Sequence, residues 1–262
     1  MHKGIYAGVS AMMVQQGATD CAANNLANVD TAGFRARKPI TKSFPEVLME
    51  RVDPAKGQGE IPPWPWRSHP IGSASMNQVL SETYMSTDEG SLQVTDSPLD
   101  VALNDGNGFF VLQDGEGNQF YSRSGHFLVN EGGQLVNPDG YLLVGDGGPI
   151  EVGEAAAVSF TDDGQIIADG VAVAQMDIVG FDSPTALRQM GKNLLAETED
   201  SGAPVPFEAP QVAVGVLERS NVNVVEEMVR LIEAQRAYEA ASKGIQTSDD
   251  MTGQLITSLA KP

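Results

Sequence analysis

Side chains capable of acid–base or metal chemistry are scattered along this chain. The three histidines, His2, His69 and His126, fall in regions of different composition and have no metal-ligand spacing. The stretch DGEGN at 114–118 resembles part of a calcium loop, but it lacks that loop's glycine and distal glutamate, so a hairpin turn explains it better. The sequence therefore predicts no metal site and no cofactor.

Patterns for nucleophilic catalysis and phosphate binding are also incomplete. Ser122, Ser124 and Ser159 lack the context of a nucleophile elbow, and Gly191-Lys192 lacks the upstream glycine of a phosphate loop. Cys21 is the single cysteine, which excludes an intrachain disulfide and a cysteine-based metal site. We therefore expect a protein that is not an enzyme, whose function depends on its structural elements.

Charge and hydropathy restrict the class of partner. The 262 residues include 35 acidic and 16 basic side chains, a formal net charge of −19. Such a surface repels nucleic acid and anionic membranes, so neither is an expected partner. No apolar run approaches the roughly eighteen residues of a membrane span, and polar residues interrupt the N-terminal segment. We expect neither direct membrane insertion nor a cleaved signal peptide.

Helical periodicity marks both ends of the chain. Residues 3–28 repeat apolar side chains at helical spacing with few charges between them. Residues 224–259 repeat apolar side chains every seven positions, which is typical of a helix seam. Asn223 is followed three residues later by Glu226, a capping-box arrangement. Neither helix has an adequate solvent face, so we expect the two to pair as a coiled-coil-like module that contacts between subunits complete.

The chain between these helices consists of two regions of different composition. Residues 36–88 contain closely spaced prolines, which favour an extended arm over a helix or central strand. Trp64 and Trp66 either anchor this arm on its own β domain or dock on a neighbouring subunit. Residues 89–217 read as an all-β domain with glycine-rich turns. Examples of its expected β runs are 99–103, 108–113, 126–130, 141–144, 158–161, 171–181 and 211–216.

These patterns predict a fold that is mainly β with α-helical termini. The all-β central domain is flanked by the N- and C-terminal helices. The expected divisions are residues 1–35, 36–88, 89–217 and 218–262.

Three asparagines interrupt the apolar stripe near the end of the first helix: Asn24, Asn25 and Asn28. As caps and turn formers they end the helix, and Gly33 permits a positive-φ turn that brings Phe34 back as an anchor. Their amides can also hydrogen-bond across subunits and fix the register of apolar rows. The sequence predicts both roles.

A small basic cluster follows directly on this otherwise acidic chain. It consists of Arg35, Arg37 and Lys38. Such a segment is either solvated or a contact for an acidic neighbour, and both interpretations stay open.

Three segments, in order, resemble the bacterial flagellar basal-body rod and hook proteins. NNLANVDTAGFRAR is similar to the family's NNLAN-x-x-T-x-GF(K/R) signature. The central LDVALNDGNGFF is similar to LDVAI-x-G-x-GFF. SNVNVVEEMVRLIEAQRAYE is similar to SNVN-x-(V/A)-E-x-M-x-x-(L/M)-I-x-x-QR-(A/S)-(Y/F)-E. Residues 40–88 match poorly.

The resemblance implies a non-enzymatic subunit of the periplasmic rod in the flagellar basal body, exported by the flagellar type III apparatus without a cleaved signal. Its partners would be itself and other rod subunits in a helical assembly, with the hook protein and surrounding ring proteins. The terminal helices would form the inner tube, and the rod would transmit motor torque to the hook. A secreted β-rich adhesin or binding protein is a remote alternative that the helical ends disfavour.

Within this family, two types of subunit are candidates. MHKGIYAGVSAM, LLVGDGGPIEV and the run from Asp169 to Glu197 resemble the proximal, F-type subunit, which we favour. The SNVNVVEEMVRLIEAQRAYEAASKGI run resembles the distal, G-type subunit, which is the alternative.

The residues predicted to form the assembly interface lie in the two terminal family segments. We expect residues 1–28 and 221–262 to be mobile in an isolated monomer and to become ordered on assembly. The predicted interface residues are Asn24, Asn25, Leu26, Asn28, Gly33, Phe34, Asn221, Asn223, Glu226, Met228, Leu231, Ile232, Gln235, Arg236, Tyr238 and Ile245.

Overall fold

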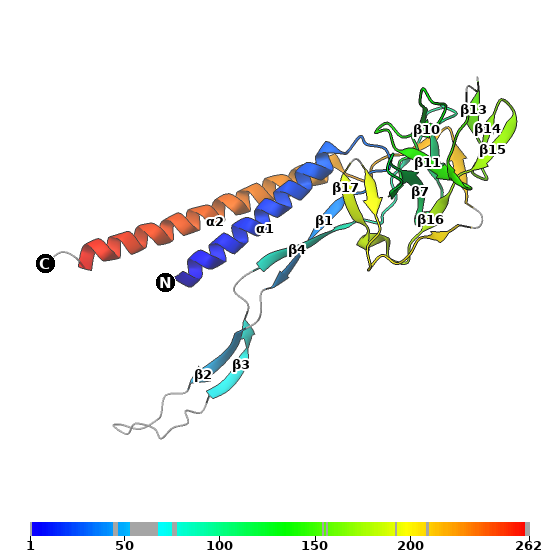
Figure 1. Cartoon of the computed structure of the whole chain (residues 1–262). Helices are drawn as coiled ribbons and strands as arrows, with labels where there is room; N and C mark the ends of the chain where they lie inside the picture. The colour runs from blue at the N-terminus through cyan, green and yellow to red at the C-terminus, as the bar shows by residue number, and fades with distance from the viewer. Residues whose placement is uncertain are drawn as a thin grey trace. The chain divides into compact units, whose positions relative to one another are not determined.

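A computed structural model shows a mainly β chain with a long helix towards each end (Figure 1). Helix α1 covers His2–Ala27 and helix α2 covers Val224–Leu259, so both predicted helices are confirmed. In the part of the chain that the structure describes, no helix combines the length and apolar character of a membrane span. The described residues are 2–43, 47–52, 68–74, 78–153, 155, 157–191, 193–207 and 210–259.

The chain separates into two compact units, each assembled from distant stretches of sequence. Unit 1 consists of Met1–Asp20, Pro39–Glu82 and Arg230–Pro262. Unit 2 consists of Cys21–Lys38 and Thr83–Val229. Both helices run through the division, so the last turns of α1 and the first turn of α2 belong to unit 2.

Unit 1 contains most of both helices together with paired strands. The strands β1 (Arg37–Ser43) and β4 (Gln78–Met85) form one two-stranded sheet, and β2 (Val47–Val52) pairs antiparallel with β3 (Ser68–Ala74). The described part of the expected arm is thus extended and paired. Trp64 and Trp66 lie outside the described residues, so their docking stays a prediction.

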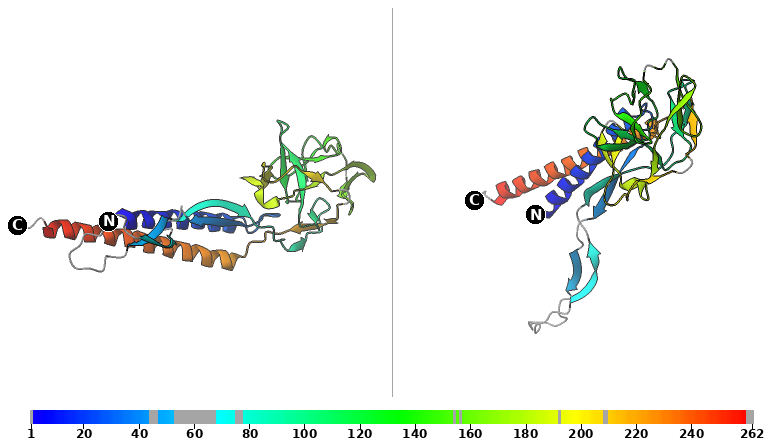
Figure 2. Two further views of the ribbon diagram at one scale, coloured as in Figure 1. Left: turned by 90° about the horizontal axis from the view of Figure 1, so that it is seen from below. Right: turned by 45° about the vertical axis from the view of Figure 1, so that its right-hand side comes forward.

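Two glycines permit close approach within unit 1. A Cβ on Gly8 of α1 would lie 2.7 Å from Cγ1 of Ile245 on α2. A Cβ on Gly17 would lie 2.4 Å from Cδ2 of Leu80 on β4. The two helices run side by side with their chain ends at the same side (Figures 1 and 2). Glycine therefore allows these neighbours to contact the α1 backbone directly.

Both helices expose large apolar side chains in the single chain. The hydrophobic rows that the sequence predicts are thus incompletely covered by contacts within it. The exposed residues are Tyr6, Val9, Met13, Val225, Met228, Val229, Ile232, Tyr238, Met251, Leu255 and Ile256.

Unit 2 is organised around a sheet with the path β17-β18-β8-β7-β11-β10-β9, joined by β12, β16 and β19. A separate three-stranded sheet has the order β13-β14-β15, and two further pairs are β20 with β6 and β21 with β5. The bounds are β5 Leu92–Val94, β6 Val101–Leu103, β7 Gly108–Gln113, β8 Gln119–Ser122, β9 Leu128–Val129, β10 Leu135–Val136, β11 Leu142–Gly145, β12 Gly148–Pro149, β13 Val158–Phe160, β14 Gln165–Ala168, β15 Val171–Gln175, β16 Ile178–Gly180, the 3₁₀ helix η1 Pro184–Ala186, β17 Arg188–Gly191, β18 Leu194–Ala196, β19 Val205–Pro206, β20 Val212–Val214 and β21 Val216–Glu218.

Strand β7 explains the core of unit 2. Successive side chains on a strand point to opposite faces. Phe110 and Leu112 accordingly pack in one apolar cluster, whereas Phe109 and Val111 pack in a second. Both faces of β7 are therefore buried, which accounts for its continuous apolar sequence.

The seven predicted β runs each contain a strand. The run 108–113 coincides with β7, and the run 171–181 divides into β15 and β16 around Met176 and Asp177. Strands that lie outside these runs include β8, β10, β14 and β18, which are only two to four residues long. Such short runs carry too little periodicity to identify.

Candidate functional site

The end of α1 and the approach to α2 meet in unit 2, in a region that we call the joint. The joint consists of residues 25–38, 86–90 and 217–223. Its contacts link three stretches that are far apart in sequence. Most of the predicted site residues near the helix ends lie here.

A tight turn after α1 returns the chain to the β domain. Gly33 has φ +67°, and its N–H donates to the carbonyl oxygen of Glu218 at 2.7 Å. A Cβ at Gly33 would lie 2.4 Å from the backbone nitrogen of Ser124, so the turn requires glycine. Phe34 follows, buried against Ala36 and Val222. The predicted turn and aromatic anchor are both confirmed.

The asparagines at the end of α1 differ in their environment. Asn25 is 1% exposed; its Oδ1 accepts from the N–H of Arg37 at 2.8 Å, and its Nδ2 donates to the carbonyl of Arg37 at 2.8 Å. Asn28 donates through Nδ2 to the carbonyl of Asn24 at 2.8 Å, and Asn24 is exposed. Asn25 therefore ties α1 to the first residue of β1. The predicted hydrogen bonds of these amides across subunits stay a prediction.

Two asparagines before α2 have separate roles. Asn221 accepts through Oδ1 from the N–H of Ala36 at 2.7 Å and donates through Nδ2 to the carbonyl of Asp88 at 2.7 Å. Asn223 accepts through Oδ1 from the N–H groups of Val225 and Glu226, at 3.1 and 3.4 Å. Asn221 thus joins the segments of the joint, and Asn223 caps α2 as predicted.

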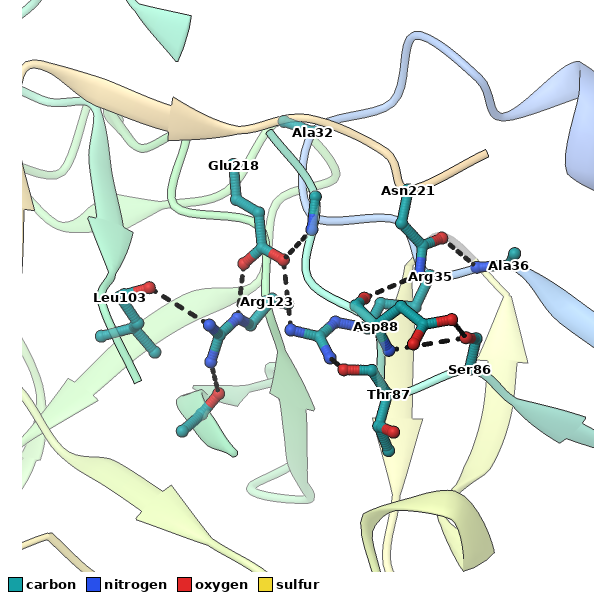
Figure 3. A network of polar contacts seen from close by, with 12 residues as sticks. Ala32, Arg35, Ala36, Ser86, Thr87, Asp88, Leu103, Arg123, Glu218 and Asn221 are labelled. Carbon is teal, nitrogen blue, oxygen red and sulfur yellow. Dashed lines mark hydrogen bonds and ion pairs between the residues drawn. The ribbon is translucent and has the colours of Figure 1, made fainter. Parts of the chain in front are cut away.

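A buried charge triad lies at the centre of the joint (Figure 3). It consists of Arg35, Arg123 and Glu218, whose side chains are 3%, 2% and 3% exposed. Nη2 of Arg35 donates to Oε1 of Glu218 at 3.1 Å, and Nε of Arg123 donates to Oε2 at 2.5 Å. One carboxylate therefore pairs with two guanidinium groups from different parts of the chain.

Backbone groups add further hydrogen bonds to the triad. Arg35 donates to the carbonyl of Thr87 at 2.5 Å, and Arg123 donates to the carbonyls of Gly108 and Leu103. The N–H of Gly90 donates to Oε1 of Glu218 at 3.1 Å. Burial lowers the pKa of Arg35 from its usual range, and the nearby carboxylate of Glu218 opposes this shift. The triad is thus a buried, hydrogen-bonded ion network.

The triad corrects the prediction for the basic cluster. Arg35 is neither solvated nor free for an acidic neighbour, because it is buried against Glu218. Arg37 donates through Nε to Gln189, and Lys38 pairs with Asp88 at 3.4 Å on the surface. Glu218 and Arg123 were not predicted from the sequence, because their partners are far away along the chain and no local pattern marks the pairing.

The chemical candidates take local structural roles. Asp114 accepts from the N–H groups of Glu116 and Asn118, at 2.9 Å each, in the turn between β7 and β8, so the predicted hairpin is confirmed. Nδ1 of His126 lies 2.6 Å from Oδ1 of Asp100. Within the described ranges, no group of three or more His, Cys, Asp or Glu side chains is placed to hold a metal ion.

The remaining predicted interface residues lie along the helices. The structure brings Asn25, Gly33, Phe34 and Asn221 together in the joint. Other members are exposed or half-buried on α1 and α2, and no contact between chains tests them. These are Leu26, Glu226, Met228, Leu231, Ile232, Gln235, Arg236, Tyr238 and Ile245.

Comparisons with known proteins cover the same segments. The family model "Flagella basal body rod protein" matches residues 5–35, and "Flagellar basal body rod FlgEFG protein C-terminal" matches residues 213–258. The model "Flagellar hook protein FlgE/F/G D1 domain" matches residues 104–168. The flagellar basal-body rod protein FlgG of Buchnera aphidicola subsp. Schizaphis graminum is 33% identical over 243 residues, covering 88% of this chain and 90% of that relative. The chain belongs to the flagellar basal-body rod protein family.

Membership explains why the joint draws on both ends of the chain. Its terminal segments coincide with the two rod-family matches at 5–35 and 213–258. The flagellar basal-body rod protein FlgG of Caulobacter vibrioides is 31% identical, covering 92% of this chain and 94% of the relative. FlgF of the same organism is 30% identical, covering 100% and 99%. The favoured F-type is therefore not distinguished from the G-type, which fits at least as well.

Proposed function

We propose that this protein is a non-enzymatic axial subunit of the flagellar rod, which self-assembles with other rod proteins and transmits motor torque to the hook. The observation that carries the proposal is the contrast between a β domain with its own apolar core and two helices with exposed apolar rows. Such rows need cover that a single chain does not supply. Membership of the rod family supports neighbouring rod subunits as the surfaces that cover these rows.

We propose further that α1 and α2 pair as a coiled-coil-like module in the assembled rod. The seven-residue repeat of α2 and the approach of Ile245 to Gly8 support this pairing. Exposed residues such as Met228, Ile232 and Tyr238 would then pack against helices of neighbouring subunits. The exposed amide of Asn24 would fix the register of those contacts, whereas the buried amide of Asn25 is bonded within the chain.

The same proposal includes how the subunit is exported, where it assembles and which other proteins it contacts. The subunit would be exported by the flagellar type III apparatus and would assemble in the periplasm, where the hook protein and ring proteins are further candidate partners. Trp64 and Trp66 remain candidates for docking on a neighbour or on the β domain. The proximal F-type position and the distal G-type position are both supported by the relatives, so the position needs a direct test.

Deletion and complementation test the proposed function. Cells without this chain should lack complete hooks and should not swim, and the intact gene should restore both. Complete hooks and normal swimming in the deletion strain would remove the assignment. An epitope on the exposed turn at Glu116, imaged on isolated hook–basal bodies, would place the subunit at the proximal or distal part of the rod.

A further inference from the structure

Glu218 contacts three parts of unit 2 that are distant in sequence. Its carboxylate accepts from Arg35 just after α1, from the N–H of Gly90, and from Arg123 on the β domain. Glu218 itself ends β21, shortly before α2 begins at Val224. One side chain therefore connects both terminal segments to the β domain, and its bond to Arg35 spans 183 residues.

The charges of the triad make partial docking unfavourable. A buried ion is costly unless a counter-ion and hydrogen bonds compensate it. Without the strand that carries Glu218, Arg35 and Arg123 would face each other with no carboxylate between them. Without the segment that carries Arg35, the carbonyl of Thr87 would lose its donor and Glu218 would lose one of its two cations.

Backbone bonds reinforce the same connection. The N–H of Gly33 donates to the carbonyl of Glu218 at 2.7 Å, and the N–H of Ala36 donates to Asn221 at 2.7 Å. Phe34 also packs on Val222. Each terminal segment thus supplies hydrogen-bond partners and an apolar contact to the other.

We propose that the charge triad couples the two ends of the chain, so that residues 31–37 and 216–222 dock on the β domain together or not at all. Without Glu218, two buried guanidinium groups would face each other with no carboxylate. Without either segment, the backbone groups that it pairs would lose their partners, whereas joint docking pairs them. The last turn of α1 and the first turn of α2 therefore become fixed to the β domain in one step. This coupling concerns the folding of unit 2 and does not depend on the proposed function.

Amide hydrogen exchange on the full chain tests the coupling. In Glu218→Gln, the amides of Gly33, Ala36 and Arg219 should lose protection together, by about 100-fold. The amide of Val111 in the core strand β7 should keep its protection. The matched control is Asp30→Asn, which weakens only a surface contact between Arg219 and Asp30, whose side chains are 51% and 87% exposed, and should leave all four amides unchanged.

The amide of Arg219 gives the decisive reading. It bonds the carbonyl of Ser91 at 2.8 Å and makes no bond to Arg35. Arg35→Lys keeps the charge but loses the planar fork, so it should lower protection at Gly33 and Arg219 together, by about tenfold. Loss at Gly33 alone, or no loss in Glu218→Gln, would overturn the coupling. If Glu218→Gln unfolds completely, Arg35→Lys decides, and loss of Val111 protection in that variant would also overturn it.

Discussion

The joint and the helices of unit 1 differ in the kinds of side chain that they bury and expose. In the joint, polar groups such as Asn25 and Glu218 are buried and hydrogen-bonded within the chain. Along α1, apolar groups such as Tyr6 and Met13 are 68% exposed. A buried amide with all its hydrogen bonds has its partners within the single chain. An exposed apolar row indicates a surface that contacts within the single chain do not cover. The contrast distinguishes residues that stabilise the fold of one chain from residues that we propose contact neighbouring subunits.

The largest loss of stability is expected from Gly33→Ala, which changes a residue of the joint. The new Cβ would meet backbone atoms of Ser124 and Arg123 at 2.4 and 2.5 Å, in a φ +67° conformation that alanine disfavours. We expect the free energy of unfolding to fall by about 4 kcal/mol, from overpacking and backbone strain together. Urea unfolding monitored by circular dichroism measures it.

A second glycine provides the control. Gly244 is exposed in α2, and no atom lies within 4 Å of a Cβ built there. Gly244→Ala should therefore stabilise the helix, by about 0.5–1 kcal/mol. Equal effects of the two substitutions would contradict the requirement for glycine at the turn.

Phe34→Ala is expected to have the next largest effect. Phe34 is buried in a small cluster with Ala36 and Val222, so its removal should cost about 3 kcal/mol of unfolding free energy. Tyr6→Ala, which truncates an exposed aromatic on α1, should change it by less than about 0.5 kcal/mol. Thermal unfolding of both variants measures the difference, and a matching loss for Tyr6 would place that ring in a core.

Local sequence signals predicted the elements of this fold well. The helix over 224–259 was predictable because a seven-residue repeat and the cap at Asn223 are both local. The turn at Gly33 was predictable for the same reason. Arg35 was wrongly interpreted because its partner Glu218 is 183 residues away, and a spacing of that kind leaves no pattern in a single sequence.

Asn25→Leu tests the buried member of two neighbouring asparagines near the end of α1. Loss of the Asn25 amide leaves the N–H and the carbonyl of Arg37 without their partner, so the free energy of unfolding should fall by about 2 kcal/mol. The β domain should stay folded, as near-ultraviolet circular dichroism would report, while rod assembly is impaired. Unchanged stability together with normal motility would show that the amide is dispensable in both roles.

Asn24→Leu separates those two roles. Asn24 is exposed on the same helix, so its substitution should leave stability within about 0.5 kcal/mol. If its amide fixes register between subunits, swimming should nevertheless decline. Normal swimming in Asn24→Leu, with a defect in Asn25→Leu, would confine the asparagines to folding within the chain.

A small effect on stability is also expected from the double variant Met228→Ser and Ile232→Ser. These side chains are 48% and 49% exposed on successive turns of α2, so the single chain loses little buried area, and the change should stay below about 1 kcal/mol. Self-association measured by sedimentation velocity should fall, because the variant removes an apolar row that neighbours would cover. Glu233→Ser, exposed beside them, is the matched control and should associate normally. A large loss of stability would mean that the row is covered within one chain. The exposed helix residues would then stabilise the fold of the single chain, as the residues of the joint do.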